Sequence, residues 1–250
     1  MAKRIMLTVA YEGTNYCGWQ LQPNGITIEE VLNAKLTELL GEPITVIGAS
    51  RTDSGVHSYG NVAVFDTDTR IPPEKISYAL NQRLPEDIVV QQSKEVRSDF
   101  HPRYCNSRKT YEYRILNRRF QLPMLRRDTY FYYYPLDVKK MQEAADYLVG
   151  EHDFQSFCSP ATSAKTTVRT IYHLDVTLQG EMIAIRVTGN GFLYNMVRII
   201  AGTLIEVGSG AKEPEQIKGI LAVCDRSAAG PTAPAHGLTM IGIEYEEKLL

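Results

Sequence analysis

Residues 4–10 read RIMLTVA and residues 27–41 read TIEEVLNAKLTELLG, and these two stretches predict how the fold begins. The first is a short apolar run followed by turn-forming residues, which is typical of a strand. The second opens with a capping box between Thr27 and Glu30, keeps its apolar residues at helical spacing and stops at Gly41. We therefore expect a strand and then a helix at the start of the chain.

Strand and helix patterns continue to alternate beyond this first pair. Strands are expected at 44–49, 61–66 and 88–92, and a helix opens at Pro72-Pro73 and runs to about Asn81. The resulting order is βαββαβ, which is that of a ferredoxin-like plait.

The second half of the chain shows a similar order without any residue-level repeat. Strands are expected at 109–116, 170–178, 182–188 and 238–245, and helices after Asp137 and at about 193–207 and 214–223. We therefore expect an α+β protein with two tandem ferredoxin-like domains, 1–103 and 104–250. Their antiparallel sheets are expected to meet at a central cleft, where a binding site would lie.

The composition is that of a globular protein. Hydrophobic residues make up 44% of the 250 residues and charged residues 22%, which excludes a largely disordered or fibrous chain. The four cysteines lie far apart, with no CxxC or Cys/His cluster, so reduced thiols are favoured over disulfides or a zinc site. No apolar run reaches the roughly 18 residues of a membrane span, and the first one is too short for a signal peptide. We expect a cytoplasmic protein without membrane contact.

The charge distribution is uneven although the net charge is only −2. We use the name basic stripe for nine residues: Arg97, Arg103, Arg108, Lys109, Arg114, Arg118, Arg119, Arg126 and Arg127. Only Asp99 and Glu112 are acidic in the same stretch. A localised basic field suits a polyphosphate partner, whereas a solvated surface strand is the plainer alternative, and charge alone does not separate the two.

Residues 49–57 (ASRTDSGVH) follow directly on an expected strand. An Arg, an Asp, a Gly and a His at a strand end are typical of an active-site loop, because such loops project side chains beyond a rigid sheet. An ordinary turn, in which Asp53 bonds nearby amides, explains the same residues, and the stretch by itself favours that interpretation.

The stretch ASRTDSGVH is also similar to GRTDAGVH, a signature of the tRNA pseudouridine synthase A family. Five further motifs resemble that family in the same order along the chain. They are 11–20 (YEGTNYCGWQ), 100–103 (FHPR), 109–113 (KTYEY), 191–198 (GFLYNMVR) and Gly237-Leu238. The resemblance covers nearly the whole chain.

The resemblance implies an isomerase that needs no cofactor. Such an enzyme breaks the N1–C1′ bond of a uridine, turns the base and rejoins it through C5. Its substrate would be the anticodon stem-loop of tRNA, at uridines 38 to 40 of the RNA, and the protein would be a homodimer.

The resemblance also implies roles for individual residues. It makes Asp53 the catalytic carboxylate, Tyr111 the active-site tyrosine, and Arg198 the partner that keeps Asp53 ionised. Asp53 could attack C1′ or C6, or stabilise a cation at C1′, and the residues do not choose between these routes. A core aromatic and a solvated surface arginine are the plainer alternatives for Tyr111 and Arg198. Arg51 would lie near the flipped nucleotide, and Leu238 would form the apolar wall under the base.

The remaining substrate contacts are expected from the basic stripe. The candidates are Arg103, Arg108, Lys109, Arg114, Arg118, Arg119, Arg126 and Arg127, of which about half would contact phosphate, given how little many surface charges contribute. His57 is expected to bond the loop backbone rather than to move protons. The aromatic run 130–135 (YFYYYP) has three interpretations, namely a base-stacking platform, a core-facing strand and a subunit contact.

Two other function classes are open to the sequence. A tRNA-binding module without catalysis would need the basic stripe but not Asp53, Tyr111 and Arg198. A metal-dependent nucleotide hydrolase would need a ligand cluster, and Asp66-Thr-Asp68 lacks a third ligand.

Overall fold

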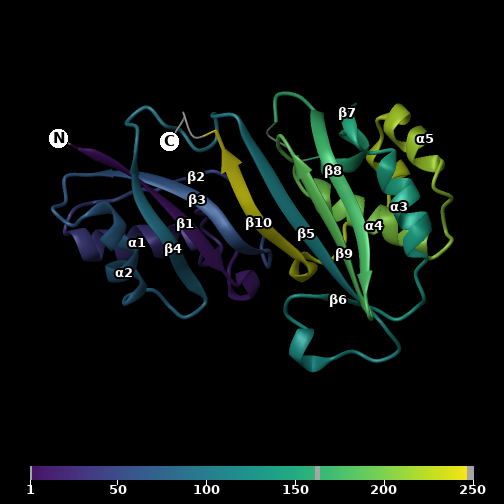
Figure 1. Ribbon diagram of the computed structural model, residues 1–250, viewed down its shortest axis with the longest axis horizontal. Coiled ribbons are helices and arrows are strands. Elements are labelled where there is room, and N and C mark those ends of the chain that lie inside the picture. Colours follow the sequence, from purple (N-terminus) through teal and green to yellow (C-terminus); the bar gives the residue numbers. More distant parts are fainter. Residues whose placement is uncertain (1, 161–163, 247–250) are drawn as a thin grey trace. The chain divides into compact units, whose positions relative to one another are not determined.

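The computed structural model describes residues 2–160 and 164–246, which fall into two compact units. The first unit holds the residues up to Ser107 together with the stretch from Met240, and the second holds Arg108–Thr239. Both units combine helices with strands, so the α+β class is confirmed (Figure 1).

The first unit is built on a sheet in the order β4-β1-β3-β10, with β2 also paired to β3. Its elements are β1 (Lys3–Tyr11), η1 (Gly13–Asn15), α1 (Ile28–Leu40), β2 (Ile47–Gly48), β3 (His57–Thr67), α2 (Pro73–Asn81), β4 (Ile88–Val96) and most of β10 (Leu238–Tyr245). Strand β1 runs antiparallel to both β3 and β4, so it forms the centre of this sheet.

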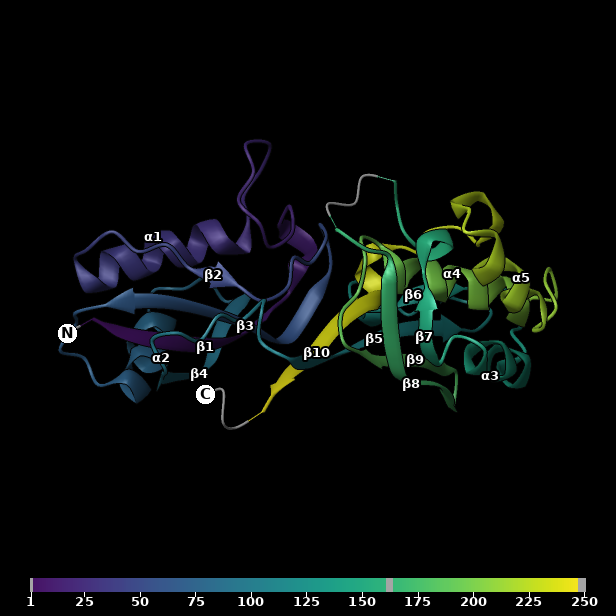
Figure 2. The same cartoon turned by 90° about the horizontal axis from the view of Figure 1, so that it is seen from above.

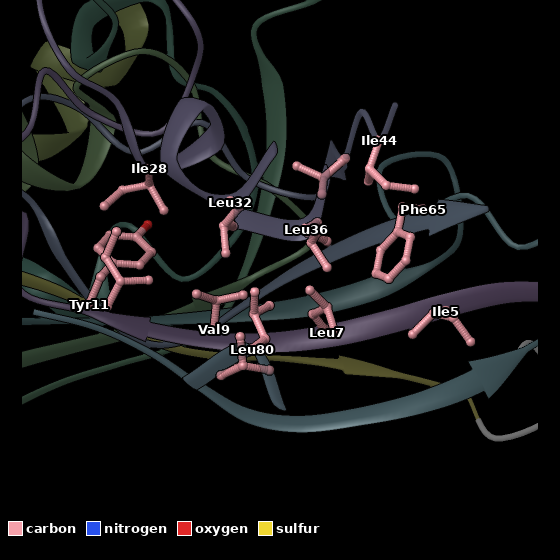
Figure 3. Packing of buried hydrophobic residues seen from close by; sticks show 14 of the residues in the cluster. Ile5, Leu7, Val9, Tyr11, Ile28, Leu32, Leu36, Ile44, Phe65 and Leu80 are labelled. Atoms are coloured by element: carbon pink, nitrogen blue, oxygen red, sulfur yellow. The ribbon is translucent and has the colours of Figure 1, made fainter. Parts of the chain in front are cut away.

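Helix α1 forms where its caps and apolar spacing predict it. The Thr27 hydroxyl accepts a hydrogen bond from the Glu30 N–H, and Gly41 ends the helix in the left-handed conformation at φ 70°. Leu32 and Leu36 point from the helix toward β1, whose alternate side chains face them (Figure 3). The fully buried side chains of this core include Ile5, Leu7, Val9, Ile28, Leu32, Leu36, Ile76 and Leu80, so α1 and α2 share one face of the sheet.

Strand β2 is shorter than expected and keeps only Ile47–Gly48. The Thr37 hydroxyl and the Asn33 side-chain oxygen on α1 accept hydrogen bonds from the N–H groups of Ile44 and Val46. The backbone before β2 is therefore satisfied by helix side chains rather than by a neighbouring strand.

The second unit has the strand order β5-β9-β8-β7. Its elements are β5 (Ser107–Asn117), η2 (Pro123–Leu125), β6 (Tyr130–Tyr132), α3 (Val138–Asp146), β7 (Gly150–Asp153), η3 (Gln155–Phe157), β8 (Val168–Gln179), β9 (Met182–Gly189), α4 (Met196–Gly208), α5 (Gln216–Val223), η4 (Arg226–Ala228) and η5 (Ala235–Gly237). These strands pair antiparallel except for β6, which lies parallel to β5. The expectation of purely antiparallel sheets was therefore wrong, because the short aromatic strand β6 adds a parallel pair.

The helices α3, α4 and α5 lie together to one side of β8 and β9 (Figures 1 and 2). Asp137 caps α3 by accepting from the N–H groups of Lys139 and Lys140, as its position predicted. Helix α4 is buried along nearly its whole length and begins at Met196, three residues later than expected. Asn195 delays the start, because it stands in the left-handed conformation at φ 60°. No helix in the described part of the chain is long and apolar enough to cross a membrane.

Candidate active site

Asp53 lies in the loop between β2 and β3. Backbone hydrogen bonds fix this loop near its beginning and near its end. The Ala49 N–H donates to the Val62 carbonyl at 2.8 Å, and the Val56 N–H donates to the Asp53 carbonyl at 3.1 Å. Gly55 turns the chain at φ 78°, a conformation that other residues rarely adopt. The Asp53 side chain itself is half-buried.

The end of β1 and the residues after it hold this loop in place by hydrogen bonds, although they lie some 40 residues earlier in the sequence. The Tyr11 and Thr52 hydroxyls lie 2.7 Å apart, and the Trp19 N–H donates to the Thr52 carbonyl at 3.0 Å. The Gly13 N–H donates to Nδ1 of His57 at 3.0 Å, so His57 accepts from the backbone of the segment after β1, whereas its expected partner lay in the Asp53 loop itself. Two of the sequence motifs thus form one hydrogen-bonded structure around Asp53.

Two glycines permit this close approach. A Cβ added at Gly13 would lie 2.0 Å from the Val56 carbonyl oxygen, and one at Gly18 would lie 2.5 Å from the Thr52 carbonyl oxygen. Gly18 also has φ 86°. Neither position can carry a side chain unless the Asp53 loop moves.

Asn61 on β3 is a further support of the loop, and no pattern in the sequence indicated it. It is fully buried, and its Nδ2 donates to the Ser50 carbonyl at 3.0 Å. The Ser50 hydroxyl is itself buried and has no hydrogen-bond partner among the described residues. Arg51, the residue expected near the flipped nucleotide, is exposed between these fixed neighbours.

Tyr111 lies on β5 in the second unit, opposite Val187 of β9. Its side chain is only 8% exposed, and its ring meets Phe192 edge to face at 5.3 Å between centroids. Phe192 belongs to the GFLYNMVR motif, so this contact joins two of the motifs. The Tyr111 ring is therefore held in a defined orientation.

Tyr113, two residues further along β5, is a core residue. It is fully buried, its hydroxyl donates to the Pro234 carbonyl at 2.8 Å, and burial raises its pKa. A Cβ at Gly237 would lie 2.7 Å from the Tyr113 ring, which explains the glycine before Leu238. Leu238 is buried at the start of β10.

Arg198 stands in the first turn of α4, where Ala233 and Asn195 accept hydrogen bonds from its guanidinium. Its Nε donates to the Ala233 carbonyl at 2.8 Å, and its Nη1 donates to Oδ1 of Asn195 at 2.9 Å. The Ala233 N–H in turn donates to the Arg198 carbonyl at 3.1 Å. The side chain is half-buried and tied down, unlike a solvated surface arginine.

The segment before η5 packs directly on α4. A Cβ at Gly202 would lie 1.8 Å from the Pro231 carbonyl oxygen, and the Gly230 N–H donates to the Thr203 hydroxyl at 2.9 Å. This close packing brings the Ala233 carbonyl to the Arg198 side chain.

Several residues of the basic stripe are engaged within the protein. Arg114 pairs with Asp128 at 2.6 Å, Arg118 pairs with Glu181 at 3.1 Å, Arg103 donates to the Gly48 carbonyl at 2.9 Å, and Arg108 lies 5.0 Å from the centre of the Tyr172 ring. Lys109 stands on β5 opposite Gly189. The pairs with Asp128 and Glu181 offset two of the positive charges that the sequence places in the stripe.

Three exposed basic side chains of the stripe lie close to η2 in the sequence. Arg119 lies over the Phe120 ring, while Arg126 and Arg127 are exposed just after η2. A role of these residues in RNA binding stays a prediction.

The aromatic run 130–135 forms a chain of ring contacts that leads from the core to the surface. Tyr130 meets the buried Tyr113, Tyr132 meets Tyr130, and Tyr134 meets both Tyr132 and Tyr133, with centroids 5.2 to 6.5 Å apart. The last two rings are open to solvent, at 52% exposure for Tyr133 and 65% for Tyr134. The start of the run thus packs against the core through Tyr113, and its end is the most exposed part.

The acidic pair Asp66 and Asp68 gives no support to a metal site. Both carboxylate oxygens of Asp66 accept from the Arg4 guanidinium, at 2.8 and 2.7 Å. Within residues 2–160 and 164–246, no group of three His, Cys, Asp or Glu side chains could hold a metal ion.

Comparison with known proteins gives one consistent match. A family model described as tRNA pseudouridine synthase matches residues 7–105 and 144–246. A tRNA pseudouridine synthase A of Thermoanaerobacter sp. is 49% identical over 97% of this chain and 100% of its own length. The enzymes of that name from Ruminiclostridium cellulolyticum and Brevibacillus brevis are 50% and 47% identical, again over 97% of this chain and all of their own length.

Proposed function

The chain belongs to the tRNA pseudouridine synthase A family, and from this we propose that it converts uridine to pseudouridine in the anticodon stem-loop of tRNA, at uridines 38 to 40 of the RNA. The reaction is an isomerisation, since the N1–C1′ bond breaks, a C5–C1′ bond forms and the proton on C5 moves to N1. The observation that carries the proposal is the Asp53 loop, which residues 11–19 fix by backbone hydrogen bonds.

Asp53 supplies the carboxylate of this reaction in our proposal. A carboxylate can act as a nucleophile toward C1′ or C6, or it can stabilise positive charge at C1′ as the glycosidic bond breaks. Each of these tasks needs a fixed carboxylate, because a displacement of about 1 Å can cost about a hundredfold in rate. The hydrogen bonds that Tyr11 and Trp19 form with Thr52 hold the neighbouring Asp53 in place.

Tyr111 and Arg198 take part in the same reaction in our proposal. The Tyr111 ring, held by Phe192, offers an aromatic face for a uracil base, and its hydroxyl can exchange a proton with the substrate. Arg198 supplies a permanent positive charge, which favours an ionised carboxylate in a site that excludes water.

The remaining proposed contacts serve to hold the RNA. A uridine in or next to a stem must leave the base stack before it can react, at a cost of a few kcal/mol. We assign Arg51 to the space around the extruded nucleotide, Leu238 to the wall beneath it, and about half of the candidates in the basic stripe to the phosphates.

We further propose that each unit is a ferredoxin-like plait and that the enzyme is a cytoplasmic homodimer. The order β1-α1-β2-β3-α2-β4 and the sheet order β4-β1-β3, with β2 on β3, support this interpretation for the first unit. The exposed Tyr133 and Tyr134 support the dimer, since large aromatic side chains are enriched in interfaces.

A decisive assay uses an unmodified tRNA transcript with uridines at positions 38, 39 and 40, incubated with the protein and EDTA. Pseudouridine is then mapped by carbodiimide labelling and reverse transcription. We expect label only at these positions and none in a transcript with cytidine there. Tight tRNA binding without any label would instead favour the non-catalytic binding module, and activity that EDTA abolishes would favour metal-dependent chemistry.

A further inference from the structure

Asn195 stands at the start of α4 in a conformation that its usual role there does not require. An asparagine before a helix normally has an extended backbone and caps the helix through its side-chain oxygen. Asn195 instead has φ 60° and ψ 5°, and its side chain makes no capping hydrogen bond. Cys224 is the only other described residue besides glycine with a positive φ.

The Asn195 side chain is used for two other contacts. Its Oδ1 accepts from Nη1 of Arg198 at 2.9 Å, and its Nδ2 donates to the Ser159 hydroxyl at 2.9 Å. The Ser159 N–H in turn donates to the Tyr194 carbonyl at 3.1 Å. The asparagine therefore connects Arg198 to a fixed point after η3.

Arg198 lies in the first turn of α4, where its charge needs compensating contacts. A positive side chain in the first turn of a helix faces the positive end of the helix dipole, which disfavours it. The hydrogen bonds that Ala233 and Asn195 accept, one at Nε and one at Nη1, help to offset this cost. Two acceptors at different nitrogens fix both the place and the plane of a guanidinium.

We propose that Asn195 is a positioning residue that sets the orientation of the Arg198 guanidinium for catalysis. This inference rests on the proposed function and on the role that it gives to Arg198. Local backbone strain that is maintained by specific side-chain contacts is typical of functional sites. The proposal explains why a residue suited to capping is used to hold an arginine instead.

The experiment compares Asn195→Gly with Cys224→Gly. Glycine accepts a positive φ without strain, so both variants keep the backbone and lose only the side chain. We expect kcat to fall about tenfold in Asn195→Gly, with KM for tRNA and the melting temperature nearly unchanged, and we expect Cys224→Gly to keep wild-type kcat. Asn195→Asp, which keeps the oxygen that faces Arg198, should recover most of the rate.

A double variant with Arg198→Met tests whether Asn195 acts through Arg198. If it does, Asn195→Gly should lower kcat no further once Arg198 is absent, whereas two independent roles would multiply. A separate readout needs no RNA: in protein with isotope-labelled arginine, the Arg198 Nε–H nuclear magnetic resonance signal should broaden or shift in Asn195→Gly.

The outcomes separate the two proposals. Full kcat in Asn195→Gly, multiplicative loss in the double variant or an unchanged Arg198 signal would overturn the positioning role while leaving the proposed function intact. Absence of pseudouridine with the wild-type protein would overturn the proposed function, and the Arg198 signal would still test the contact.

Discussion

The loop around Asp53 is fixed by hydrogen bonds to Thr52 and to the Asp53 backbone carbonyl, which do not involve the Asp53 carboxylate. Thr52 is bonded by Tyr11 and Trp19, and the Asp53 carbonyl accepts from Val56. We therefore expect Asp53→Asn to lower kcat by at least about a thousandfold, because the amide keeps the size of the side chain but not its charge. Its melting temperature and tRNA affinity should match those of the wild type.

Asp99→Asn provides the control for this prediction. Asp99 is an exposed carboxylate that pairs with the exposed Arg97 at 2.9 Å, and such surface pairs contribute little to stability. This variant should react at the wild-type rate. Turnover of Asp53→Asn within a few fold of the wild type would contradict the catalytic assignment.

The contacts within the basic stripe indicate which of its residues can reach phosphate. Arg114 and Arg118 pair with acids, whereas Arg119, Arg126 and Arg127 are exposed. Changing these last three to glutamine should weaken tRNA binding and flatten its salt dependence. Each true phosphate contact contributes about 0.7–0.9 to the slope of log K against log salt.

The salt dependence is measured by titrating tRNA at several salt concentrations. Lys75→Gln with Arg83→Gln, on or next to α2, removes positive charge outside the stripe and should leave the slope unchanged. An unchanged slope in the triple variant would mean that the segment around η2 does not contact RNA.

At the scale of elements, a single added methyl group at Gly13 is enough to disturb the contact between the β1–α1 segment and the Asp53 loop. Gly13→Ala places a Cβ 2.0 Å from the Val56 carbonyl oxygen, so the loop must shift. We expect kcat to fall at least about tenfold, since a shift of this size moves Asp53 relative to bound substrate.

Gly219→Ala is the matched control, because a Cβ at this position in α5 would meet nothing within 4 Å. It should stabilise the protein by about 0.5–1 kcal/mol, as an alanine does in place of a helical glycine, and leave kcat unchanged. If Gly13→Ala lowers the melting temperature but leaves kcat unchanged, the contact between Gly13 and the Asp53 loop supports the fold rather than the site.

The elements also show what the sequence could and could not predict. Helix α1 was predictable because Thr27, its apolar spacing and Gly41 all act within one stretch of chain. The shortening of β2 was not, since it depends on Asn33 and Thr37 reaching backbone groups that only folding brings near. A strand at 130–135 was one of the interpretations of the aromatic run, but its parallel pairing with β5 was not predictable, because the run does not indicate which strand it will join.

The same distinction applies to the site. The motif around Asp53 was visible in the sequence, but its supports Gly13 and Asn61 became interpretable only from their contacts. Asn195 lies within the motif GFLYNMVR, yet nothing in that motif indicates its left-handed backbone. The roles of Gly13, Asn61 and Asn195 follow from their contacts in the folded protein, which the sequence does not display.

At the scale of the whole molecule, the strand β10 shows that chain order does not decide which unit a segment joins. From Met240 on, the chain groups with the first unit, in which β10 is a neighbour of β3. A Cβ at Gly60 of β3 would lie 3.3 Å from the Ile241 carbonyl oxygen, so the two strands lie close. The first unit is therefore completed only when the C-terminal strand has been made.

The proposed homodimer gives the last prediction, which distinguishes the uses of Tyr133 and Tyr134. Light scattering should give a mass about twice the 28.2 kDa of one chain. If these exposed rings lie in the interface, Tyr133→Ser with Tyr134→Ser should shift the protein toward monomer, because large aromatic anchors contribute strongly to interfaces. If the rings stack on RNA bases, the variant should stay dimeric and lose tRNA affinity, with about 1–3 kcal/mol lost per stacked base. A dimer with wild-type affinity would exclude both uses. Tyr59→Ser, a change of an exposed tyrosine on β3, is the control and should alter neither the mass nor the affinity.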